Sequence, residues 1–360
     1  MSAQPTEKEK APARTAAQPP LQPAERRTGG RYLAALSPKN ISAVYLLVLI
    51  VIIFTLWAPA VFPQMATLSQ VFNGNAVIGL AALALAIPLS ARVFDLSFAY
   101  TMSLSGVTTA YFIVNFDWPL WMAIGAGLAA ALVVGLINAL VVVVLRVDSM
   151  IGTLATGSII QAFITFVTGE IPITDARLAG GFSTIGQTSV AGFILPVYYM
   201  VVAAVVIWYV LDHTPLGRRI YATGFNTEAA RLTGIKTKKI QFGSLLVSAL
   251  LAGWAGISLA SILGSGSPTA GTPYLLPAFA AAFLGATQIK AGRFNAWGTV
   301  LGVITLGAGT TGLALATAPA WASNMFTGIV LIAALAVTMV QRKPRNGQSW
   351  LAALLRRSPR

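Results

Sequence analysis

The stretch PLWMAIGAGLAAALVVGLINALVVVVL, residues 119–145, contains no charged side chain and a single side-chain amide, that of Asn138. A helix that crosses a membrane needs about 20 mostly apolar residues, and this run is longer. Apolar types make up 56% of the 360 residues and charged types only 9%, against about 25% charged in a typical soluble domain. The mean hydropathy is +0.76. A soluble fold this poor in charge could not cover its own surface, so the sequence predicts an integral membrane protein.

Outward from this stretch, the same length criterion predicts an all-α polytopic bundle of about ten transmembrane helices, some of them short or broken. The ranges are 41–62, 71–90, 94–115, 119–145, 150–169, 192–211, 241–263, 275–289, 296–315 and 321–340. The third range is weakly apolar, because Ser, Thr and Tyr run through it, and the eighth is short. We expect residues 1–40 to form a disordered tail, 41–341 the membrane domain, and 342–360 a basic tail.

The basic residues predict which loops face the cytoplasm. Ten spans with a cytoplasmic N-terminus place both basic termini, the 212–240 loop and the short loops at Arg92, Arg146 and 290–293 inside. Of the 24 Lys and Arg residues, only Arg177 falls outside. The positive-inside rule therefore predicts that both termini are cytoplasmic. It also explains the net charge of +14 as a topology and lipid-headgroup signal, with no nucleic-acid partner.

The sequence argues against several kinds of chemical site. It contains no cysteine and one histidine, His213, so we expect no thiolate or imidazole metal cluster. It has neither a phosphate-binding Gly-Lys-Ser/Thr loop nor a nucleophile elbow. Few ionisable side chains lie at membrane depth, where gradient-driven transporters normally need them. We therefore predict no catalytic residue, no metal and no cofactor, and either a passive channel or a protein that a partner drives.

The 212–240 loop is the longest predicted cytoplasmic connection. Asn226 is a suitable N-cap for a short helix, with Glu228 in its first turn, and Gly234 is a suitable C′ residue. Such a helix would dock on a partner or, alternatively, lie on the lipid headgroups as a linker. The candidate docking residues are Gly224, Asn226, Glu228, Ala229, Ala230, Gly234 and Ile235.

The run TPLGRRIYATGFNTEAARLTGI, residues 214–235, resembles the cytoplasmic loop of ribose-type ABC transporter permeases. Other segments agree in order along roughly residues 41–340: Asp95-Leu-Ser, Gly135-Leu-Ile-Asn138, Ala252-Gly-Trp-Ala-Gly256, Pro268-Thr-Ala-Gly-Thr272 and Gly298-Thr-Val-Leu-Gly302. The chain departs from the family pattern at 91–99 and 285–293, where glycine-rich segments are common.

The resemblance implies that this loop holds a coupling helix that docks on a cytoplasmic ABC ATPase subunit. It also implies a multi-pass protein of the bacterial inner membrane, with a second permease copy and a periplasmic solute-binding protein as partners, beside the membrane lipids. A simple sugar is the expected solute. Branched-chain amino acids or nucleosides, and an ATPase-independent channel, stay open as alternatives.

Polar residues within the predicted spans are candidates for the translocation path: Asn73, Asn75, Asp95 and Gln161. The alternative is that they form hydrogen bonds with neighbouring helices or, for Asp95, cap a helix. The small residues Ala131, Gly135 and Ala139 allow a close helix contact, either within the chain or between two copies.

Overall fold

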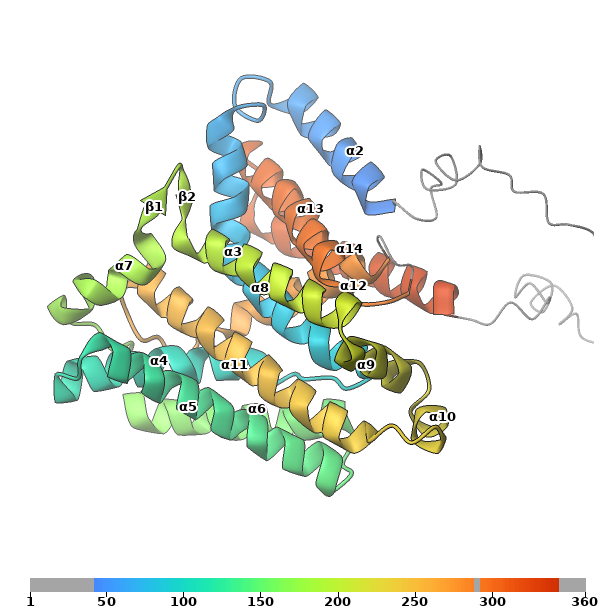
Figure 1. The fold of residues 1–360 in the computed structure, drawn as a ribbon. Coiled ribbons are helices and arrows are strands. Elements are labelled where there is room, and N and C mark those ends of the chain that lie inside the picture. The colour runs from blue at the N-terminus through green and yellow to red at the C-terminus, as the bar shows by residue number, and fades with distance from the viewer. Residues whose placement is uncertain (1–41, 288–291, 343–360) are drawn as a thin grey trace, which may run out of the picture. The chain divides into compact units, whose positions relative to one another are not determined.

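A computed structural model describes residues 42–287 and 292–342 of the chain (Figure 1). The long helices are α2 (Ser42–Trp57), α3 (Met65–Ser90), α4 (Phe98–Phe116), α5 (Leu120–Ala139) with a following π-helical turn η1 (Leu140–Val144), α6 (Ser149–Thr168), α8 (Leu195–His213), α11 (Thr237–Leu263), α12 (Leu275–Ala286), α13 (Ala296–Leu315) and α14 (Ala320–Arg342). The shorter elements are η2 (Ala176–Ala179), α7 (Gly181–Gln187), β1 (Ser189–Val190), β2 (Phe193–Ile194), α9 (Pro215–Phe225), α10 (Thr227–Leu232) and η3 (Thr272–Tyr274).

The predicted all-α membrane fold is confirmed, and each predicted span range overlaps with one long helix. Seven of the helices in the described part are long and apolar enough to cross a membrane. The helix α4 is not among them, as its Ser, Thr and Tyr content leads one to expect, and α2 and α12 are shorter apolar helices. The count of about ten is therefore approximate. The predicted tails 1–40 and 342–360 lie outside the described residues, except for Arg342, the last residue of α14.

Two span boundaries among the described residues differ from the predicted ranges by five residues or more. The first helix ends at Trp57 rather than at residue 62, because the chain turns at 58–64, ahead of α3. The second begins at Met65 rather than at residue 71. Polar residues such as Gln70 and Asn73 do not interrupt a helix, since the backbone groups of a helix are satisfied internally.

The helices α3 and α11 form the interior of the bundle. Within their most apolar windows, 72% of α3 and 67% of α11 are buried, against 33% for α6. The helix α11 packs against α3, α4 and α5, and it runs across the middle of Figure 1 between these neighbours. The path of α11 therefore determines where the surrounding helices lie.

Small residues bring α4 close to α11. A Cβ added at Gly256 of α11 would collide with the carbonyl oxygen of Met102 in α4. A Cβ added at Gly106 of α4 would lie 2.9 Å from the Cβ of Ala260. Since lipid supplies no hydrophobic force between helices, such close van der Waals contact is a main source of helix association.

The row Ala131, Gly135 and Ala139 on α5 also packs within the chain. A Cβ added at Gly135 would lie 2.7 Å from the Cβ of Ala249 in α11. Ala131 lies opposite Gly253, and Ala139 packs in a cluster with Leu245. Of the two alternatives for this row, the contact within the chain is the one that the structure contains.

The connection 170–191 is more ordered than a plain loop. It contains η2 and α7, and it leads into a two-residue antiparallel hairpin that pairs Ser189 with Ile194. Its base is tied to the turn after α11, because Ile173 and Gly266 form a β-bridge. Short elements of this kind satisfy their own backbone groups at the end of the bundle.

A test of the α4–α11 contact compares two glycines with different surroundings. Gly256→Ala should destabilise the protein by about 1–3 kcal/mol, because the added methyl group overpacks the interface. Gly125→Ala on α5 should be neutral or stabilising, because its Cβ meets nothing within 4 Å and alanine favours helix. Melting temperatures in detergent measure both effects. Equal melting temperatures would contradict the proposed packing.

Candidate functional site

The segment between α8 and α11 contains two helices where the sequence predicted one. Thr214 caps α9, and its hydroxyl accepts a hydrogen bond from the Gly217 amide at 3.3 Å. Asn226 caps α10, and its side chain accepts from the Ala229 amide at 3.0 Å, which confirms the predicted cap. Gly234 has a φ of 84°, as a C′ residue does.

The helix α9 was missed, although its start carries a recognisable signal. Thr214 followed by Pro215 is a common arrangement of N-cap and first helical residue. Gly217 and Gly224 both lie inside α9, although glycine is a poor helix former. Gly224, one of the candidate docking residues, is not part of α10. It lies inside α9, where an added Cβ would collide with the carbonyl oxygen of Ser90 at the end of α3.

Ala230 does not face outward as expected. Its exposed fraction is 5%, so α10 packs through Ala230 against the rest of the chain. Asn226, Glu228, Ala229 and Gly234 are exposed, and Ile235 is half-buried. The outward face of α10 also carries an ion pair between Glu228 and Arg231, with an N–O distance of 2.8 Å.

Two large apolar side chains next to α10 were not anticipated. Phe225, just before the cap, is 85% exposed, and Leu232, at the last position of the helix, is 84% exposed. These two side chains, one before the six-residue helix and one at its end, form an exposed apolar surface. Such a surface suits a contact with another protein. The sequence signal was present, since both interrupt an otherwise polar and small-residue segment.

The helix α9 is anchored to parts of the chain that are distant in sequence. The Tyr221 hydroxyl donates a hydrogen bond to the carbonyl oxygen of Phe294 at 2.9 Å. The Arg293 guanidinium lies over the Tyr221 ring, 5.6 Å from its centroid. Burial raises the pKa of the Tyr221 phenol, and the charge of Asp212 raises it further. With the contact of Gly224 on Ser90, α9 is joined to the end of α3 and to the residues before α13.

Asp95 lies in a buried network of hydroxyl groups ahead of α4. It is 1% exposed, and one carboxylate oxygen accepts from the Ser97 hydroxyl at 2.7 Å and the Ser97 amide at 3.1 Å. The other accepts from Ser248 of α11 at 2.9 Å. The Asn138 amide of α5 donates to the Ser97 hydroxyl at 2.6 Å. This network joins α4, α5 and α11.

The other three candidate path residues are dispersed, and each makes its own local contact. Asn73 donates to Gly192 O at 3.1 Å and accepts from the Ile194 amide at 3.0 Å, which holds the hairpin. Asn75 donates to Val71 O one turn earlier. Gln161 of α6 donates to Pro268 O at 3.3 Å. The structure does not bring Asn73, Asn75, Asp95 and Gln161 together into one site.

Arg177, the one basic residue on the predicted outer side, is neutralised by two carboxylates. It lies 2.6 Å from Asp117 and 2.9 Å from Asp175. These hydrogen bonds and charges lower the pKa of Asp175 to about 2. The positive-inside rule places few basic residues in outer loops. The two carboxylates offset the charge of the one arginine predicted to lie there.

Residues 67–335 match the family described as branched-chain amino acid transport system / permease component. Among curated relatives, the ribose import permease protein RbsC of Escherichia coli (strain K12) is 33% identical over 304 residues, which cover 82% of this chain and 92% of the relative. RbsC of Bacillus subtilis (strain 168) is 33% identical over 289 residues, 80% of this chain and 89% of the relative. The L-arabinose transport system permease protein AraH of Escherichia coli (strain K12) is 29% identical over 272 residues, 74% and 81% of the two chains. The chain therefore belongs to this family of membrane-spanning ABC transporter permeases, on its ribose-type side.

Proposed function

We propose that the chain is the permease subunit of an ATP-driven importer that carries a small hydroxylated solute, a simple sugar, across the bacterial inner membrane. The observation that carries the proposal is the capped helix α10 with the exposed side chains of Phe225 and Leu232, in a chain 33% identical to ribose import permeases. In this proposal ATP hydrolysis takes place on a separate cytoplasmic ATPase subunit. A channel that works without an ATPase is not favoured, since the matched relatives are named import permeases.

The proposed partners divide between the two ends of α8. The hairpin β1–β2 precedes this helix, and α9 and α10 follow it. A helix of 19 residues spans about 28 Å at 1.5 Å per residue, so the two loop groups lie at opposite ends of the bundle. We assign the α10 end to two ATPase subunits and the hairpin end to a periplasmic solute-binding protein. A second copy of the chain would complete the transporter.

Single-cysteine labelling tests which loops face the cytoplasm. The chain is suitable for it because it contains no cysteine. A thiol reagent that does not cross the membrane should modify Gln187→Cys but not Lys238→Cys in intact cells, and should modify both in inverted or opened membranes. Both side chains are exposed. Thr237, although next to Lys238, is 4% exposed and would be protected by burial on either side. Labelling of Lys238→Cys alone in intact cells would reverse the topology.

Docking is tested by truncating the exposed pair. Phe225→Ala with Leu232→Ala should abolish ATP-driven uptake of radiolabelled ribose and co-purification with the ATPase encoded nearest to this chain, while expression stays normal. Loss of a central apolar contact at an interface costs about 2 kcal/mol or more. Phe166→Ala on α6, where the phenylalanine is also 85% exposed but lies on neither proposed docking surface, is the matched control.

Ala230→Arg would be a weaker test of docking than this double variant. Because Ala230 is buried, an arginine there would also displace α10 from its packing in the chain. The double variant Phe225→Ala, Leu232→Ala also tests the alternative of an ATPase-independent channel. That alternative would be supported if ribose uptake needed no ATP and were unchanged in the double variant.

Among the polar residues of the spans, Gln161 best suits the path. Its side-chain oxygen is buried and has no hydrogen-bond partner in the described part of the chain, and a hydroxylated solute supplies donors. Gln161→Leu should lower the apparent affinity for ribose about fivefold, since one hydrogen bond is worth about 1 kcal/mol, with little change in melting temperature. Asn73→Ala should lower stability instead, because Asn73 holds the hairpin. Unchanged uptake by Gln161→Leu would remove this residue from the path.

A further inference from the structure

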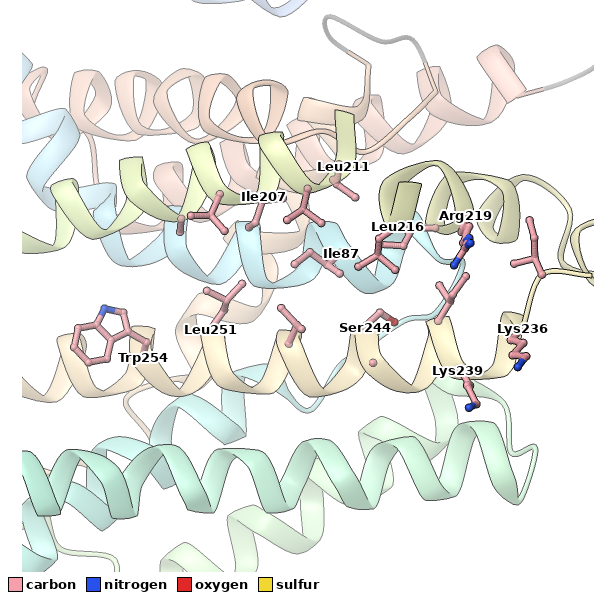
Figure 2. Close-up of a pocket in the computed structure, with 18 of the residues that line it drawn as sticks. Ile87, Ile207, Leu211, Leu216, Arg219, Lys236, Lys239, Ser244, Leu251 and Trp254 are labelled. Carbon is pink, nitrogen blue, oxygen red and sulfur yellow. The ribbon is translucent and has the colours of Figure 1, made fainter. Parts of the chain in front are cut away.

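A large apolar groove lies between α8 and α11 (Figure 2). Its volume is about 1240 Å³. Leu80 and Ile87 of α3 form part of its floor, and apolar side chains of α8 and α11, such as Val206 and Leu251, form its walls. Trp254 lines the end of the groove away from α9.

The other end of the groove is positively charged. Arg219 of α9 and Lys236 and Lys239, at the start of α11, line this end, and all three are exposed. Figure 2 shows their nitrogen atoms at the end opposite Trp254. The ion pairs among residues 42–287 and 292–342 involve Arg177 and Arg231 and none of these three cations. The groove is therefore apolar along its length and cationic at one end.

We propose that this groove is a binding site for one anionic phospholipid, with its phosphate on Arg219, Lys236 and Lys239 and an acyl chain along α8 and α11. Basic pockets between transmembrane helices are suited to anionic lipid headgroups. Lysine and arginine also place their charges at headgroup level while their stems cover apolar surface.

The length of the groove fits a lipid chain. From Lys239 to Trp254 the helix α11 advances 15 residues, or roughly 22 Å at 1.5 Å per residue. One leaflet contributes about half of a hydrocarbon core that is about 30 Å thick. The groove is therefore longer than the hydrocarbon layer of one leaflet. An acyl chain whose phosphate lies at the cations would be in the groove over its whole length.

The lining does not suit the transported solute. A sugar needs hydrogen-bond partners around its ring, but the polar side chains among those that line the groove are few and lie mainly towards the cationic end, such as Ser244 and Thr233. Binding a hydroxylated molecule against apolar walls would cost free energy for each hydroxyl group that loses water without gaining a partner. The site is thus separate from the proposed path and does not depend on which solute is carried.

The test uses the full-length protein, purified in detergent and titrated with phosphatidylglycerol or phosphatidylethanolamine. Native mass spectrometry counts the lipids bound. The protein should retain phosphatidylglycerol preferentially, and inorganic phosphate or glycerol phosphate alone should neither bind detectably nor compete. Lys236→Gln with Lys239→Gln should weaken retention roughly thirtyfold, since each basic residue near an anionic surface contributes about 1 kcal/mol. Arg218→Gln with Lys238→Gln removes the same charge from the same segment outside the groove, and should have little effect.

A second pair of variants tests the apolar part of the site. Gly243 lines the groove, and a Cβ added there meets nothing within 4 Å. Gly243→Phe should therefore fold normally, fill the groove and displace the acyl chain, with a loss of bound lipid of at least tenfold. Gly125→Phe on α5 is the matched control, because Gly125 also faces open space and does not line this groove.

Three outcomes would overturn the proposal. Equal retention of the two phospholipids would remove the role of the cations. Unchanged retention in Gly243→Phe would place the lipid elsewhere on the protein. A change from dimer to monomer in Gly243→Phe, with lipid retention unchanged, would assign the groove to a second copy of the chain. None of these readouts requires transport, so they stand apart from any failure of the proposed import function.

Discussion

The close approach of α4 and α5 to α11 is the contact on which much of the remaining structure depends. Gly106, Gly253 and Gly256 leave no room for side chains at these crossings. With α11 held there, Ser248 reaches Asp95 near one side of the bundle. Further along, the Ser261 hydroxyl donates to Phe182 O of α7 at 2.7 Å. The helix α11 thus positions both the hydrogen-bond network of Asp95 ahead of α4 and the short helix α7 in the 170–191 connection.

Asp95 illustrates how a bundle with few charges accommodates a buried carboxylate. Burial of an ionised group is costly unless it is paired and hydrogen-bonded. Here the partners are the hydroxyls of Ser97 and Ser248 and a backbone amide, and no basic side chain in the described ranges forms an ion pair with it. The serines are small enough to lie between closely packed helices. The network therefore adds polarity without widening the contact of α11 with its neighbours.

The sequence was most informative where a single local rule applies. The long apolar runs predicted where the helices lie, and the Asn226 cap and Gly234 predicted the bounds of α10. Features that depend on packing could not be predicted in this way. Ala230 and Gly224 are small residues in a polar loop, where the sequence gives no sign of burial. In the structure Ala230 is buried, and Gly224 packs against the Ser90 carbonyl. The polar residues Asn73, Asn75 and Gln161 could be placed in spans, but their hydrogen-bond partners lie as far as 121 residues away in sequence.

The anchoring of α9 has a mechanical consequence. In sequence, the segment with α9 and α10 is tethered to α8 and α11, whereas in space α9 rests on Ser90 at the end of α3 and on Phe294 just before α13. A force applied at α10 would therefore be shared among four helices rather than two. Since α3 and α13 pack against each other, the load would enter the bundle through its interior.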